Sequence, residues 1–198
     1  MATSLQSRRM TVKELLDLER QATDDIHREL FRGQLQEFPE MTTRSPRHSA
    51  SISKFSQQLL NWAEANKRPD AIVCAGEVRC RMSTDAESIV GVDVAYFEGT
   101  SFREDLEDQA YFDGPPVIAV EVLSPSNTHE QISQRIKEFL VAGVRQVWIA
   151  DPDFQTVAVY KANVRPTMYS HGEHLIGAPD LPGFECPVEK LFGGTQEM

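Results

Sequence analysis

Hydrophobic residues in this chain follow two spacings, a helical one in three stretches and an alternating or continuous one, typical of strands, between them. Thr11 and Glu14 form a capping box that predicts a helix to about Arg20. Ser45 before Pro46 predicts the start of a second helix. Its inward residues are Ile52, Phe55, Leu59 and Trp62. A third helix is predicted from about 128 to 142, ended by Gly143.

Short apolar or alternating runs predict the strands. They are 29–31 and 35–38 around a tight turn, then 71–74, 78–82, 90–97, 117–123, 147–150 and 156–160. The run 117–123 is nearly all apolar, so we expect it at the centre of a sheet. The last two strands surround the turn Asp151–Asp153 and predict a hairpin. A turn at 181–183 and a short helix ending near Phe192 complete the chain.

This alternation of strands and helices, without repeats, favours one α/β domain over residues 1–198, with a flexible N-terminus at 1–10 and a flexible tail at 193–198. No apolar run approaches the roughly 20 residues of a membrane-spanning helix. No apolar segment follows Arg8 and Arg9 to make a secretory signal. The three cysteines contain no C-x-x-C pair and are expected to be core thiols. These features predict a cytoplasmic protein.

The net charge of −10 does not favour a broad basic face for nucleic acid. Basic residues cluster only locally, at 8–9, 44–47 and 79–81. The strongest acidic patch, 104–108, is expected in a solvated loop. Charge alone therefore does not identify DNA as a partner.

Two acids interrupt strands that should be buried. Glu121 lies within the apolar run 117–123, and Asp93 lies within 89–96 among apolar neighbours. A carboxylate in such a strand costs several kcal/mol unless it is paired, protonated or bound to a metal. If the two strands are neighbours, both carboxylates can hold one divalent cation. The alternative is that each acid forms a salt bridge or reaches water at a strand end.

The chain resembles the Uma-type family of bacterial putative restriction endonucleases. The matching segments are Glu121-Val-Leu-Ser-Pro-Ser126, Ala142-Gly-Val144, Trp148 and Asp151, Val92-Asp-Val94, Glu29-Leu-Phe-Arg-Gly-Gln-Leu35, Ser45-Pro-Arg-His48 and Leu181-Pro-Gly183. They cover nearly the whole chain in the right order. The resemblance implies a restriction-endonuclease-like PD-(D/E)XK core, a mixed β-sheet flanked by helices.

The resemblance also implies a site. Asp93 and Glu121 would bind Mg²⁺ or Mn²⁺, with the backbone carbonyl of Val122 as a third oxygen ligand. The ion would polarise a phosphodiester and activate a water molecule. Glu29 would complete the acidic group, and His48, one helical turn before Ile52, would point toward the acids. Taken alone, a histidine at a helix start is more often structural.

The sequence departs from the family pattern at several positions. Val92 replaces the proline, and the lysine of the Glu-x-Lys signature is Leu123, as is usual in this family. The family supplies a lysine from the following helix, where this chain has Arg135. Gln131 and Phe139 replace a family acid and a tyrosine. At 100° per residue, Arg135 falls closer to the apolar stripe than Lys137, which makes it the better candidate.

Three functions agree with these residues. The first is a Mg²⁺-dependent endonuclease that hydrolyses DNA, in which Arg135 stabilises charge, because arginine does not deprotonate water. The second is a degenerate nuclease-fold module that binds nucleic acid or a protein partner. The third is an enzyme acting on another phosphate-containing substrate. Because proteins of this fold often act as homodimers, the hairpin 147–160 is expected to offer an exposed edge for self-association.

Overall fold

The computed structural model of the chain describes residues 9–24, 26–38, 45–83, 87–102, 110–125 and 127–193. The predicted helices are confirmed. Helix α1 (Val12–Gln21) begins with the Thr11–Glu14 capping box. Helix α2 (Pro46–Ala65) is capped by Ser45, and helix α4 (His129–Ala142) ends at Gly143, whose φ of 103° is favourable only for glycine. A 3₁₀ helix, η1 (Val188–Leu191), lies where the short terminal helix was expected.

A six-stranded mixed sheet forms the centre of the molecule, in the order β10-β9-β8-β7-β6-β3. Its strands are β3 (Ala71–Ala75), β6 (Val94–Glu98), β7 (Ile118–Val122), β8 (Gln146–Asp151), β9 (Thr156–Tyr160) and β10 (Thr167–Tyr169). Strands β7 and β8 are parallel because α4 connects them, and the other pairs are antiparallel. Strand β7 is therefore central, as predicted.

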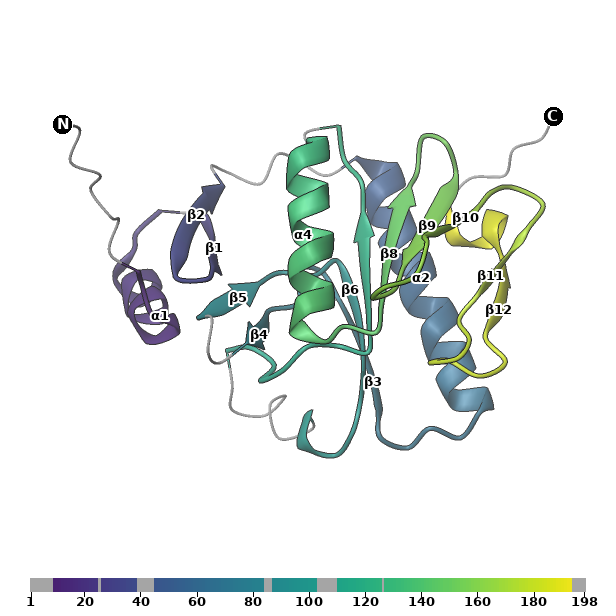
Figure 1. The fold of residues 1–198 in the computed structure, drawn as a ribbon, viewed down its shortest axis with the longest axis horizontal. Helices are drawn as coiled ribbons and strands as arrows, with labels where there is room; N and C mark the ends of the chain where they lie inside the picture. Colours follow the sequence, from purple (N-terminus) through teal and green to yellow (C-terminus); the bar gives the residue numbers. More distant parts are fainter. Residues whose placement is uncertain are drawn as a thin grey trace.

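Helices α2 and α4 cover opposite faces of this sheet (Figure 1). Side chains of β7 alternate between the two faces, as strand geometry requires. Val120 packs with Phe55 and Leu59 of α2, whereas Ala119 packs with Ile136 and Phe139 of α4. Both faces are buried, which explains the continuous apolar run in the sequence.

A second sheet has the order β2-β1-β5-β4 and carries α1 on one face. Its strands are β1 (His27–Phe31), β2 (Gln34–Phe38), β4 (Cys80–Ser83) and β5 (Ser88–Val90). Arg32 and Gly33 join β1 to β2 with positive φ values of 48° and 77°, the conformation of a tight hairpin turn. A small third sheet pairs β11 (His174–Ile176) with β12 (Glu185–Pro187).

The predicted single strand 90–97 is wrong, because the chain changes sheets within it. Strand β5 pairs with β1 and β4, and β6 pairs with β3 and β7. Residues 91–93 form the junction between the two sheets. The apolar pattern gave no sign of this break because the residues on both sides are buried.

The hairpin 147–160 is formed by β8 and β9, as predicted, but it is not an edge. Strand β10 pairs with β9 through residues 167–169 and covers it. The prediction of an exposed edge at this hairpin is therefore wrong, and β10 and β3 are the outer strands of the sheet.

The remaining predictions concern charge, cysteines and the ends of the chain. Arg79 pairs with Glu19, and Arg81 pairs with Asp113. All three cysteines are free, Cys80 and Cys186 buried and Cys74 half-buried. The acidic patch 104–108 lies outside the described residues, as do Arg8, Arg44, 1–8 and 194–198. Among the helices in the described ranges, none is long and apolar enough to cross a bilayer.

Candidate active site

Asp93 lies at the junction between the two sheets and is buried. Its Oδ2 accepts a hydrogen bond of 2.8 Å from the backbone N–H of Val122, on the central strand. The Nε2 atom of His48 lies 3.5 Å from the same oxygen. Asp93 is therefore held between β7 and the first turn of α2.

His48 reaches Asp93 because of its place in α2. The Ser45 side chain caps the helix by accepting from the His48 N–H at 3.2 Å, which fixes the first turn. The imidazole is buried, 3% exposed. The structure thus brings together Asp93 and His48, which are far apart in sequence and come from different elements.

Glu121 points from β7 toward α4. Its Oε2 lies 3.5 Å from Nε of Arg135. A hollow of about 30 Å³ adjoins it, lined also by Val122, Leu123 and Gln131 among others. This space is sufficient for one or two water molecules. Gln131 also completes the capping box of α4 with Thr128, which accounts for a polar residue at this position.

Glu29 is the most buried acid of the group, 1% exposed on β1. Its Oε1 accepts from the backbone N–H of Gly91 at 2.7 Å, and both its oxygens accept from Arg135 at 3.1–3.5 Å. Burial alone raises the pKa of Glu29, but the charge of Arg135 and the hydrogen bonds from His27 and Gly91 together lower it below its ordinary value.

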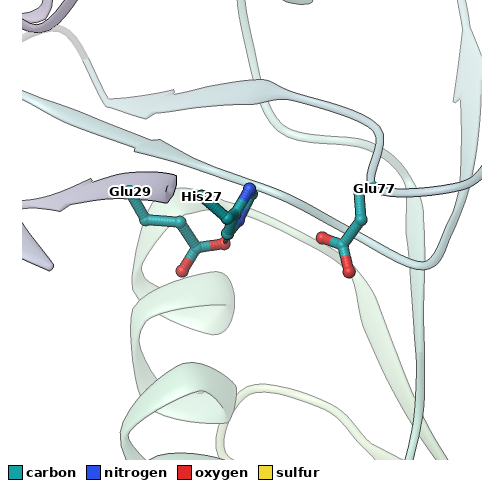
Figure 2. Close-up of side chains that lie close together, drawn as sticks. All are labelled: His27, Glu29 and Glu77. Atoms are coloured by element: carbon teal, nitrogen blue, oxygen red, sulfur yellow. Dashed lines mark ion pairs between the residues drawn. The ribbon is translucent and has the colours of Figure 1, made fainter. Parts of the chain in front are cut away.

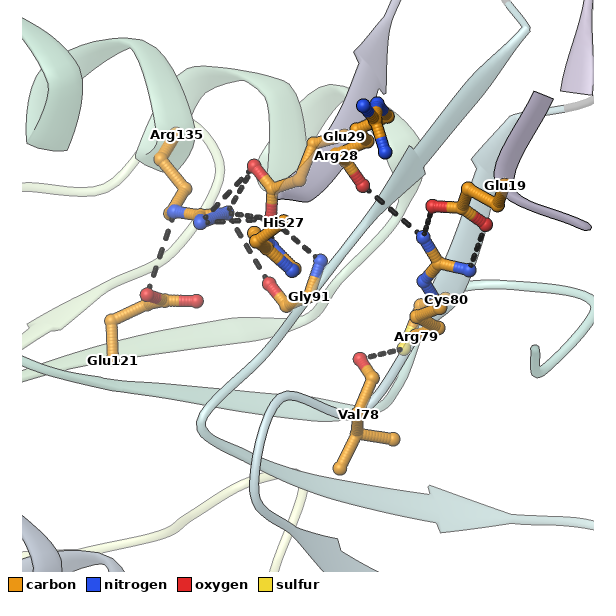
Figure 3. A network of polar contacts seen from close by, with 10 residues as sticks. All are labelled: Glu19, His27, Arg28, Glu29, Val78, Arg79, Cys80, Gly91, Glu121 and Arg135. Carbon is orange, nitrogen blue, oxygen red and sulfur yellow. Dashed lines mark hydrogen bonds and ion pairs between the residues drawn. The ribbon is translucent and has the colours of Figure 1, made fainter. Parts of the chain in front are cut away.

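Arg135 connects the acids (Figure 3). Its guanidinium contacts Glu29 and Glu121 and donates to the Gly91 carbonyl at 3.2 Å. Burial lowers the pKa of Arg135, but the negative charges of Glu121, Glu29 and Asp93 raise it to a net value above normal. Lys137 is exposed on the same helix, so Arg135 is the cation that faces the acids.

Sequence reasoning missed three residues beside this group. Gly91 binds Glu29 and Arg135 through its backbone, and His27 places Nε2 3.6 Å from Oε1 of Glu29. Glu77, between β3 and β4, lies close to both His27 and Glu29. The sequence held one signal for this, since His27 and Glu29 are two residues apart on a strand and therefore share a face.

The donor set suits a hard divalent cation. Asp93, Glu121 and the Val122 carbonyl would offer oxygen ligands, which Mg²⁺ prefers. Arg135 already neutralises part of the negative charge around Glu121. An ion bound there must therefore share Glu121 with the guanidinium or displace it.

The buried pair of Glu29 and Arg135 predicts an acid-sensitive contribution to stability. Glu29→Gln should lower the free energy of unfolding by about 2 kcal/mol at pH 7, less than for a fully buried pair, because Arg135 keeps Glu121. Since the folded-state pKa of Glu29 is lowered, its contribution is present above the ordinary pKa of 4.5 and is lost as pH falls through the lower folded value.

Urea denaturation of wild type and Glu29→Gln between pH 3 and pH 7 measures the difference in their free energies of unfolding. We expect a constant gap above about pH 5 that narrows below it. Glu138→Gln is the control, because Glu138 pairs with the exposed Arg32 and should change stability by less than about 1 kcal/mol. A gap between wild type and Glu29→Gln that stays constant down to pH 3 would contradict the prediction.

Comparison with known proteins supports the expected family and fold. A family model described as Uma2, putative restriction endonuclease, matches residues 12–189. A crystal structure of a putative nuclease of DUF820 from Anabaena variabilis has the same mixed α/β fold, with a TM-score of 0.73 over 92% of this chain and 97% of that chain at 22% sequence identity. The search of curated proteins gave no match. Because the family model spans nearly the whole chain, the protein belongs to the Uma2 family of putative restriction endonucleases.

Proposed function

We propose that the protein is a divalent-metal-dependent endonuclease that hydrolyses DNA phosphodiester bonds. The observation that carries the proposal is the approach of three acids from three segments. Arg135 contacts Glu29 of β1 and Glu121 of β7, and Asp93 of the sheet junction accepts from the backbone N–H of Val122, the residue after Glu121. The family match adds a nuclease assignment at the family level. Clustered acids with one guanidinium are suited to metal-assisted phosphoryl chemistry.

The proposed roles combine the family resemblance with the contacts of each residue. Asp93, Glu121 and the Val122 carbonyl hold the cation, Mg²⁺ or Mn²⁺. When bound, the ion supplies Lewis-acid polarisation of the phosphate and lowers the pKa of a bound water. His48 contacts Asp93 and orients that carboxylate or the water beside it. Arg135 offsets the negative charge that develops on the phosphate. It does not act as the general base, because a guanidinium stays protonated and cannot take a proton from water.

Glu29 acts as a positioning residue. It is fully buried and binds the guanidinium of Arg135 through both of its oxygens. Bidentate pairing of this kind fixes the plane of a guanidinium. Glu29 therefore aims Arg135 toward Glu121 and completes the acidic group without having to bind the metal itself.

DNA is negatively charged and so is this chain, with a net charge of −10, so binding requires local basic residues near the site. Two exposed arginines lie near the ends of the site elements: Arg32 in the β1–β2 turn and Arg47 beside His48. Both form exposed ion pairs, which exchange readily for phosphate contacts. Cutting both strands of a duplex requires two centres, so a homodimer is part of the proposal.

A specific observation favours a second candidate function. The Arg135 guanidinium already compensates the charge of Glu121 and Glu29, as a bound cation would. In a degenerate module that binds nucleic acid or a protein, this ion-pair network would replace the metal. The two candidates differ in whether a divalent cation binds at Asp93 and Glu121.

A plasmid-nicking assay with Mg²⁺ or Mn²⁺ tests the proposal. Wild type should nick supercoiled DNA, and Asp93→Asn and Glu121→Gln should each lower the rate by about 100-fold or more, because each removes one carboxylate charge at the metal. Circular dichroism establishes that the variants are folded. A folded wild type that neither cuts DNA nor binds the cation by calorimetry would refute the enzyme and favour the degenerate module.

A second prediction concerns the residue that replaces the family lysine. Arg135→Met should reduce nicking by about 100-fold, because it removes the positive charge from the site. Arg135→Lys should stay within about tenfold of wild type, since lysine keeps the charge but loses the bidentate geometry. Lys137→Met on the same helix is the matched control and should leave nicking unchanged. An Arg135→Met variant as active as wild type would show that Arg135 takes no part in catalysis.

A further inference from the structure

We propose that His27, Glu29 and Glu77 form a second cation site, distinct from the Asp93–Glu121 site and selective for transition-metal ions such as Mn²⁺ or Zn²⁺. The inference does not depend on nuclease activity. It rests on the placement of three ligand groups, on the backbone beneath them and on a path from solvent.

The three side chains converge from two segments (Figure 2). One ligand atom from each lies within 4.8 Å of the others. His27 and Glu29 are two residues apart on β1 and therefore face the same side of the strand. Glu77 approaches from the segment between β3 and β4. A metal ion about 2.1 Å from each ligand atom holds its ligands about 3–4 Å apart, so small side-chain movements would complete the site.

Gly91 makes this convergence possible. Its N–H donates to Oε1 of Glu29, and a Cβ at position 91 would lie 3.4 Å from that oxygen and would overlap Oε2 of Glu77. The absence of a side chain thus lets two carboxylates approach over one stretch of backbone. Carboxylates this close repel each other, and a shared cation converts the repulsion into coordination.

The site opens to solvent through a hollow of about 300 Å³, lined in part by His27 and Glu77. Two arginines also line it, and carboxylates at the same hollow offset their charge: Asp24 pairs with Arg28, which also pairs with Glu37, and Glu19 pairs with Arg79. Because His27 and Glu77 both line this hollow, it gives an ion a path to them from solvent.

The ligand chemistry separates this site from the other. An imidazole nitrogen with two carboxylates favours Mn²⁺, Zn²⁺ and related ions, whereas an all-oxygen set favours Mg²⁺. Glu29 belongs to both groups, since its Oε1 contacts His27 and Arg135. A cation bound at His27 would compete with Arg135 for this carboxylate and so couple the two sites.

Pulsed electron paramagnetic resonance of the full chain with Mn²⁺ tests the proposal, because an imidazole ligand gives a nitrogen coupling that an all-oxygen site lacks. Wild type should show this coupling. His27→Ala should abolish it, and Glu77→Gln should weaken the nitrogen-coupled Mn²⁺ binding by about tenfold or more. Asp93→Asn and His48→Ala should both retain it, whatever their nuclease activity.

Gly91→Ala provides a variant that keeps every ligand. Its Cβ should displace the Glu77 carboxylate and weaken the nitrogen-coupled binding while the thermal melt stays cooperative. Loss of the coupling in His48→Ala with retention in His27→Ala would overturn the proposal, as would wild-type Mn²⁺ binding with no nitrogen coupling. Neither outcome would bear on the nuclease proposal, which the nicking assay tests separately.

Discussion

The ion pairs of Arg135 hold the proposed site together. One guanidinium ties α4 to β1 through Glu29, to β7 through Glu121 and to the sheet junction through the Gly91 carbonyl. Glu29 is buried, and a buried carboxylate without its partner costs several kcal/mol. The negative charges in turn raise the pKa of Arg135 above its ordinary value despite burial. The buried acids therefore depend on this guanidinium to offset their charge.

The second constraint is the passage of the chain between sheets at residues 91–93. If one strand continued through this segment, the direction of the Asp93 side chain would be set by the alternation of side chains between the two faces of a single sheet. The break instead lets Asp93 accept from the Val122 N–H, with His48 against the same oxygen. The buried carboxylate of Asp93 is thereby provided with partners.

The sequence predicted those features that local physical rules determine. Capping residues set the helix starts, and the apolar run 117–123 identified the central strand. The family resemblance pointed to Arg135, and helical geometry also favoured it over Lys137. The sheet change, the covering of β9 by β10 and the approach of Glu77 to His27 depend on contacts between distant segments. No pattern within a window of ten residues carries that information.

The proposed function requires that Asp93 and Glu121 bind a divalent cation beside Arg135. The most direct measurement is anomalous diffraction from a crystal of the protein soaked in Mn²⁺. We expect an anomalous peak within about 2.5 Å of oxygens from both carboxylates, with the Val122 carbonyl as a further ligand. No peak there, with Arg135 still bridging Glu29 and Glu121 at high Mn²⁺ concentration, would contradict it and identify the guanidinium as the permanent cation of the site.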